Sequence, residues 1–228
     1  MTGAAGQADP RYAVYWTPAP DTPLAQVEAR LFHGTPELRG VDPADLAEAV
    51  RTPAHYGLHA TLKAPFHLIP GASAGELHAA VEGFARGHPP VEAPALQVAE
   101  LGGYLALRPG GPAPELDALA ASAVRAFDGF RRPPDADELA RRRGGGLTAQ
   151  QDDYLRLWGY AYVFDAFRFH VTLAGPCDAA TRGRLMPALE AGLAPALDGP
   201  FRLDALSLAM QPDRGSPFQV AARYPLQG

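Results

Sequence analysis

The sequence has few of the features that mark secreted, membrane-spanning or metal-binding proteins. Cys177 is the only cysteine among 228 residues, so a disulfide within the chain and a multi-cysteine metal site are both excluded. No apolar run approaches the roughly 20 residues that cross a bilayer. Residues 1–10 have neither the charged nor the apolar region of a secretory signal. We therefore expect a cytoplasmic protein without membrane contact, and a flexible tail at residues 1–10.

An excess of positive charge is also missing. The chain has 20 Lys and Arg residues against 25 Asp and Glu residues, which gives a formal net charge of -5. A long nucleic acid is therefore not expected as a partner, because such a polyanion usually needs a broadly basic surface. A small anionic ligand fits this charge better. The sequence gives no indication of the oligomeric state.

The apolar residues that are present make up a regular alternation of predicted strands and helices. A period of two predicts strands at residues 11–16, 59–66, 96–101, 104–107, 160–173, 203–210 and 218–224. A period near 3.6 predicts helices at residues 24–31, 73–84, 116–127 and 178–197. The strand at 160–173 is expected to bend near Asp165. This order repeats a mixed unit of strands and helices, so we expect an α+β fold.

Two helix starts carry a capping box, and a charged stretch separates the two halves of the pattern. Ser73 is followed three residues later by Glu76, and Thr148 by Gln151, which is the spacing of a capping box. Between them, residues 131–146 are charged and rich in glycine and proline. We expect one domain at 11–228 with an insertion at about 131–158.

The most informative feature is a repeated four-residue motif. His59-Ala60-Thr61-Leu62 and His170-Val171-Thr172-Leu173 share the pattern H-x-T-L and lie about half a chain length apart. Average residue usage makes two such matches in one chain a rare coincidence. On a strand, residues i and i+2 face the same side, so each His shares a face with its Thr, while the leucines face the core. If the two halves are related by an approximate two-fold axis, both polar faces meet at one site.

Such a site suits displacement at phosphorus. One neutral His takes a proton from water, and a protonated His on the other side gives a proton to the leaving oxygen. We therefore predict that His59 and His170 are the catalytic pair, although the sequence leaves their acid and base roles open. Thr61 and Thr172 are predicted to donate hydrogen bonds to the phosphate oxygens. This chemistry needs neither a metal ion nor another cofactor.

Two cations are further candidates for phosphate binding. Lys63 follows Thr61 by two residues, and Arg168 precedes His170 by two residues, so an unbroken strand puts each cation on the face of its motif. Cations on strands are also often solvated or protect an edge from aggregation. We therefore predict phosphate binding by Lys63 and Arg168. The alternative is that each side chain is solvated or protects a strand edge.

Two H-x-T motifs in two similar halves resemble the two-histidine (2H) phosphoesterase superfamily. The segments YGLHATLKAPF at 56–66, GLTAQQDDYLRLWGY at 146–160 and FRFHVTLAGP at 167–176 are similar to its branch from bacterial phosphonate-utilisation operons. The resemblance implies a bilobal fold, with antiparallel sheets and outer helices around a central cleft. It also implies hydrolysis of a small cyclic phosphate, either a cyclic sugar phosphate or a nucleoside 2′,3′-cyclic phosphate.

The sequence leaves other interpretations open. The protein could bind or process a phosphate or an RNA end in the same pocket, with Tyr154, Trp158 and Tyr160 as stacking residues. A metal site could form if His55, His59 and His67 shared one strand face, although Pro65 interrupts that strand. Cys177 is expected to be a small buried residue, not a nucleophile. Whether Arg131, Arg132 or Gln151 reaches the pocket is not decided by their spacing.

Overall fold

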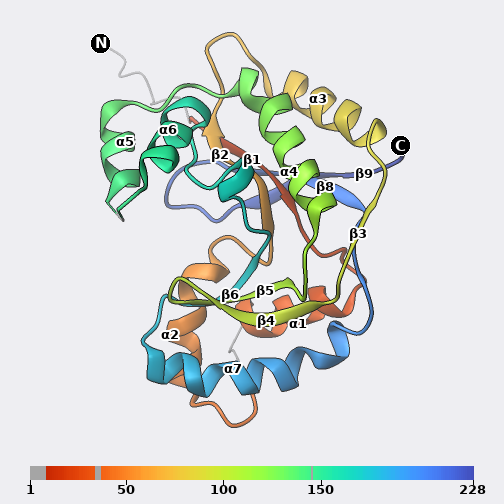
Figure 1. Cartoon of the computed structure of the whole chain (residues 1–228), viewed down its shortest axis with the longest axis vertical. Helices are drawn as coiled ribbons and strands as arrows, with labels where there is room; N and C mark the ends of the chain where they lie inside the picture. The colour runs from red at the N-terminus through yellow and green to blue at the C-terminus, as the bar shows by residue number, and fades with distance from the viewer. Residues whose placement is uncertain (1–8, 34–36, 145) are drawn as a thin grey trace, which may run out of the picture.

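The computed structural model describes residues 9–33, 37–144 and 146–228, and it contains two larger antiparallel sheets in opposite halves of the molecule (Figure 1). The upper sheet has the order β2-β1-β8-β9, and the lower sheet has the order β4-β5-β6. Their strands are β1 (Arg11–Trp16), β2 (Ala60–His67), β4 (Leu96–Leu101), β5 (Tyr104–Pro109), β6 (Val171–Ala174), β8 (Ala205–Gln211) and β9 (Gln219–Pro225). The short strands β3 (Val91–Ala93) and β7 (Phe201–Leu203) pair with each other at one side.

The helices cover the outer faces of the two sheets (Figure 1). Helices α3 (Ala74–Arg86) and α4 (Pro114–Phe127) pack on the upper sheet, and α2 (Pro43–Ala54) and α7 (Ala179–Leu193) pack on the lower one. Helix α1 (Pro23–Phe32) packs against α2. Helices α5 (Ala136–Arg143) and α6 (Ala149–Trp158) contact each other above the lower half. This arrangement confirms the predicted α+β fold class with antiparallel sheets.

Local sequence accounts for where several helices begin. The capping boxes at Ser73 and Thr148 are both formed, with reciprocal hydrogen bonds to Glu76 and Gln151. Asp178 caps α7 by accepting a hydrogen bond from the backbone N–H of Thr181. These caps confirm the predicted starts of the three helices.

The two sheets do not correspond to the two halves of the chain. The upper sheet combines β1 and β2 from the N-terminal part with β8 and β9 from the C-terminal part, and the lower sheet is built from the middle of the chain. Helices α1 and α2, which follow β1 in the sequence, lie in the lower half beside α7 (Figure 1). The two motifs therefore belong to two different sheets. Each half of the molecule is nevertheless built from segments that are far apart in the sequence.

One sequence-based prediction of secondary structure is wrong, and helices α2 and α5 were not predicted. The predicted strand at 160–173 is a strand only at Val171–Ala174, and a 3-10 turn occupies Phe164–Ala166, where Phe164 has a φ of 54°. Ala161, Val163 and Phe169 are buried, so their apolar side chains reflect packing and not strand pairing. Helix α2 was not predicted, although Asp42 caps it and Pro43 occupies its first turn.

The predicted tail at residues 1–10 lies only partly within the described residues. Most of the predicted tail, residues 1–8, lies outside the described residues. Asp9 is held by Arg132 at 2.5 Å and by His67 at 3.2 Å, so at least this residue packs on the domain. No helix within the described ranges is both long and apolar enough to span a membrane.

Candidate active site

The two motif histidines stand at equivalent places in the two sheets. His59 immediately precedes β2, and His170 immediately precedes β6. Both side chains are half-buried, as are Thr61 and Thr172, whereas the intervening Ala60 and Val171 are buried. The alternation predicted for each motif is therefore present, with each His and Thr on the less buried face.

Both imidazole rings are held by the same local hydrogen bond. The Nδ1 atom of His59 lies 2.9 Å from the carbonyl oxygen of Gly57, and Nδ1 of His170 lies 2.8 Å from that of Arg168. A carbonyl only accepts, so each Nδ1 carries the hydrogen and donates it. In a neutral ring this leaves the lone pair on Nε2, and each ring presents this second nitrogen for proton transfer. His59 and His170 are far apart in the chain, yet both have the Nδ1–H tautomer and the same hydrogen bond to the backbone carbonyl two residues earlier.

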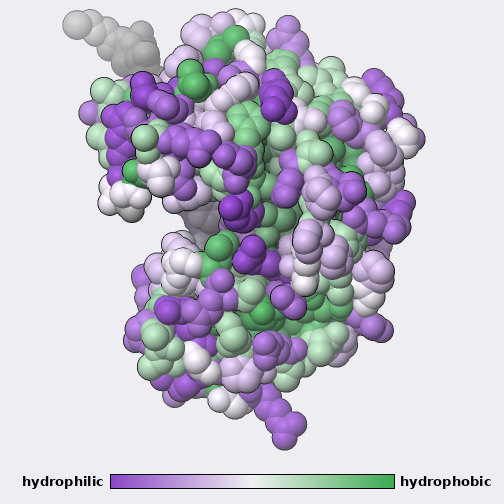
Figure 2. Space-filling model, viewed as in Figure 1, coloured by the Kyte–Doolittle hydropathy of each residue, from purple (hydrophilic) through white to green (hydrophobic). Residues whose placement is uncertain are grey.

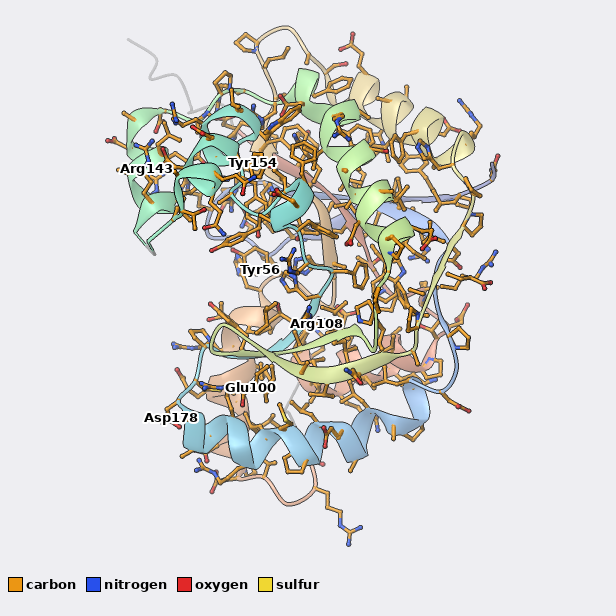
Figure 3. All side chains as sticks on the ribbon, in the orientation of Figure 1. Tyr56, Glu100, Arg108, Arg143, Tyr154 and Asp178 are labelled. Carbon is orange, nitrogen blue, oxygen red and sulfur yellow. The ribbon has the colours of Figure 1, made fainter. Side chains whose placement is uncertain are left out.

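Aromatic residues surround His59. The ring centroid of Tyr15 lies 4.2 Å from that of His59, and the centroid of Tyr56 lies 5.9 Å away. Phe218 stacks on Tyr56, with centroids 5.5 Å apart and an interplanar angle of 21°. Figure 3 shows Tyr56 in the region between the upper and lower halves. No pattern in the sequence marks these three aromatic residues, because they come from β1 and from two loops.

This environment favours the neutral form of His59. Burial lowers the pKa of His59 from its ordinary value of 6.5 to about 4. The hydrogen bond to Gly57 raises the pKa, and the charge of His170 lowers it further. His59 is therefore uncharged at neutral pH and can accept a proton.

The two threonines complete the motifs on the open face. Thr61 lies opposite Tyr15 on β1, and Thr172 lies opposite Ala106 on β5. Among the described residues, no side-chain hydrogen bond uses either threonine hydroxyl, so both can donate to a ligand. Figure 2 shows a deep notch between the upper and lower halves of the surface. The site therefore offers two hydroxyl donors and two imidazole nitrogens.

Lys63 does not belong to this face, and the prediction that it faces the cleft is wrong. Thr61 pairs with Tyr15 and Lys63 with the adjacent Val14, so Leu62 is an extra residue that forms a β-bulge. The bulge turns Lys63 to the core side of the sheet, where its exposure is only 2%. Its Nζ donates to Asp128 at 2.7 Å and to the carbonyl of Val124 at 3.2 Å. Its position therefore indicates a structural role.

Arg168 stays near the second motif. It lies before β6 and not within a strand, so the strand argument that placed it does not apply. Its side chain is exposed, and Nη1 donates to the carbonyl oxygens of Asp165 at 2.8 Å and Phe167 at 2.5 Å. Phosphate binding by Arg168 stays a prediction.

The residues of the predicted insertion have partners of their own. Arg131 donates to Asp128 and to the carbonyl of Leu157, and Arg132 pairs with Asp9. Gln151 caps the backbone of Thr148. None of these contacts involves a motif residue.

The alternative metal site is not assembled. His55 lies near Gln211, His67 near Asp9, and His59 binds Gly57, so the three rings have different neighbours. Within residues 9–33, 37–144 and 146–228, no three His, Cys, Asp or Glu side chains form a group that could hold a metal ion. Cys177 is half-buried, and burial raises the pKa of its thiol, which disfavours the reactive thiolate.

Comparison with known proteins gives a family and distant structural likenesses. A curated relative from Janthinobacterium sp. (strain Marseille), called ribose 1,5-bisphosphate phosphokinase PhnN, is 34% identical over 231 residues, which cover 96% of this chain and 51% of the relative. The chain spans about half the length of the curated relatives it matches. The protein TT0787 of Thermus thermophilus aligns over 96% of this chain and 98% of its own, with 16% identity and a TM-score of 0.47. E. coli LigT, solved with 3′-AMP, aligns over 96% and 99%, with 15% identity and a TM-score of 0.43.

The fold and the site together define the class of protein. Two antiparallel sheets, each with an H-x-T motif at the start of one strand, resemble the two-histidine phosphoesterases. The family model described as "Protein of unknown function (DUF1045)" matches residues 61–219, and the chain belongs to this family.

Proposed function

We propose that this protein is a metal-independent phosphodiesterase that hydrolyses a small cyclic phosphate ester by general acid–base catalysis. One observation carries this proposal. Imidazoles at the starts of strands in two different sheets have the same Nδ1 hydrogen bond to a backbone carbonyl, so both leave Nε2 for proton transfer. Binding alone needs hydroxyls and cations, whereas two matched imidazoles supply the two proton transfers of hydrolysis.

The two histidines take different roles in this mechanism. His59 is the base: its Nε2 accepts a proton from water while the water oxygen forms a bond to phosphorus. His170 is the acid: its Nε2–H gives a proton to the alkoxide oxygen as the bond from that oxygen to phosphorus breaks. The hydroxyls of Thr61 and Thr172 donate to the non-bridging oxygens, where negative charge increases in the transition state. The lowered pKa of His59 supports this assignment of the base.

Two arguments support a substrate class: the size of the reacting group and the name of a curated relative. A cyclic phosphate of a ribose fits a site with one pair of hydroxyl donors. The curated relative is named for a kinase of ribose 1,5-bisphosphate, and this name supports testing a ribose phosphate first. Nucleoside 2′,3′-cyclic phosphates are the second candidate.

A panel of cyclic phosphates tests the proposal. The panel contains ribose cyclic phosphates with and without a second phosphate, the four nucleoside 2′,3′-cyclic phosphates and a linear diester. Assays contain excess chelator, and we expect one cyclic class to be opened at an undiminished rate. Loss of all turnover on chelation would contradict metal independence. Binding of the panel without any turnover would support a phosphate-binding or RNA-end-binding protein instead.

We expect the pH dependence of kcat/KM to identify the base. The neutral form of His59 is the active one, and its pKa is about 4, so activity persists from neutral pH down to about pH 4. Below that pH, kcat/KM falls about tenfold per unit because His59 becomes protonated. Initial rates from pH 3.5 to 9.5, with recovery checked at pH 7, test this. An acid limb near pH 6.5 would contradict the assignment of His59.

A further inference from the structure

Arg108 is a cation beside the second motif that the sequence pattern did not reveal. On β5, Ala106 lies opposite Thr172 and Leu107 opposite Val171, so the next residue, Arg108, lies beside His170. Leu107 is fully buried in the core, and successive residues of a strand face opposite sides. Arg108 therefore shares the open face with Thr172 and His170. Figure 3 shows Arg108, like Tyr56, in the region between the two halves.

The guanidinium of Arg108 has an unsatisfied donor. Its Nε is buried, yet it has no hydrogen-bond partner among the described residues, while the side chain as a whole remains partly exposed. A buried donor without a partner costs stability, so it calls for an explanation, such as a ligand. The Nε–H and one Nη–H form the fork that binds two oxygens of a phosphate.

The equivalent place in the upper sheet is already satisfied. Trp16 lies opposite Ala60, so Thr17 is the residue beside His59. The hydroxyl of Thr17 lies 2.6 Å from that of Ser207, so these two side chains satisfy each other. The two positions next to the motif histidines therefore differ. Thr17, beside His59, has a hydrogen-bond partner. Arg108, beside the proposed acid His170, has an Nε–H without one.

We infer that Arg108 binds the substrate, with its Nε–H and Nη–H donating to the anionic oxygens of the phosphate next to Thr172. This inference rests on the proposed function for the identity of the substrate, but phosphate binding itself does not depend on turnover. Arg108 is thus a phosphate-binding cation beside the second motif, whereas Lys63 was predicted beside the first. The ligand class is a phosphate group with at least two free oxygens.

Binding of inorganic phosphate tests the inference separately from catalysis. Phosphate is titrated at low salt into the wild type, Arg108→Lys and Arg108→Met, and binding is followed by the NMR signals of the histidine rings. We expect affinity to fall about 10-fold in Arg108→Lys, which keeps the charge but loses the fork, and up to about 100-fold in Arg108→Met. Arg202→Met is the control, since Arg202 pairs with Glu92 on the β3–β7 ribbon. Its affinity should stay within twofold of the wild type.

The melting temperature distinguishes a binding role of Arg108 from a structural role. Arg108→Met removes an unsatisfied donor, so the unliganded variant should have a melting temperature equal to or above that of the wild type. With a substrate that the panel identifies, both variants should raise KM more than they lower kcat. The inference is overturned if wild-type protein binds no phosphate, if Arg108→Met binds it within twofold of wild type, or if the variant is clearly less stable. Failure of the whole panel alongside a positive titration would reject the hydrolase but not the role of Arg108.

Discussion

Replacing either motif histidine by glutamine should lower kcat for the cyclic phosphate by about 10² to 10⁴, because each proton transfer is worth a factor of that size. Glutamine is close to histidine in size and still forms hydrogen bonds, but it does not exchange protons near neutral pH. The double variant His59→Gln/His170→Gln should be little slower than the slower single variant, because the two groups act in one concerted step. Steady-state kinetics with saturating substrate measure this.

A matched control shows that the loss comes from the site. His78 lies on α3, and its Nδ1 lies 2.6 Å from the hydroxyl of Tyr224, so it is part of a side-chain contact elsewhere on the upper sheet. His78→Gln should retain kcat within a factor of two. KM of the two motif variants should change less than kcat, because the threonines still bind the phosphate. Retention of more than one tenth of the wild-type kcat in His59→Gln or His170→Gln would remove the acid–base mechanism.

Replacing Asp128 by asparagine should lower the free energy of unfolding by about 3–5 kcal/mol, the usual cost of leaving a buried charge without its partner. Asp128 accepts hydrogen bonds from Nζ of Lys63 at 2.7 Å and from Nε of Arg131 at 2.8 Å. The exposure of these two cations is 2% and 9%. Burial acts to raise the pKa of Asp128, but the hydrogen bonds from Arg131 and Lys63 outweigh burial and hold the pKa below its ordinary value.

Urea unfolding at neutral pH measures this loss, with an exposed ion pair as the control. Glu92 pairs with Arg202 at 3.1 Å, and both side chains are more than half exposed. Glu92→Gln should change stability by no more than about 1 kcal/mol. The stabilisation by ionised Asp128 is present above the ordinary pKa of the carboxyl and is lost as the pH falls through its lowered value. A loss below about 1 kcal/mol in Asp128→Asn would show that Lys63 and Arg131 do not depend on this carboxylate.

Local patterns in the sequence predicted much of this fold. The capping boxes at Ser73 and Thr148 formed as expected, because they involve residues only three positions apart. The burial alternation of both H-x-T-L motifs also follows from neighbouring residues on one strand. The strand at 160–173 was predicted wrongly because aromatic and branched residues occur both in strands and in buried loops. There, the turn at Phe164 interrupts the extended backbone.

Contacts between distant residues decided which cations face the cleft. An unbroken strand predicts Lys63 on the face of Thr61, but the bulge at Leu62 depends on how β2 pairs with β1. Arg108 has no motif of its own, and only the pairing of β5 with β6 places it beside His170. Strand pairing is not encoded in the spacing of either strand alone, so no period in the sequence indicates these positions.

The sequence by itself determined that two His-Thr pairs exist, that each pair shares a face, and that excess positive charge and cysteine clusters are absent. These properties depend on composition and on spacings of a few residues. The tertiary structure alone decided that the two pairs come from separate sheets, that burial lowers the pKa of His59 to about 4, and that Lys63 points away. The physical reason is that solvation, strand register and charge–charge interaction depend on residues brought together from distant parts of the chain.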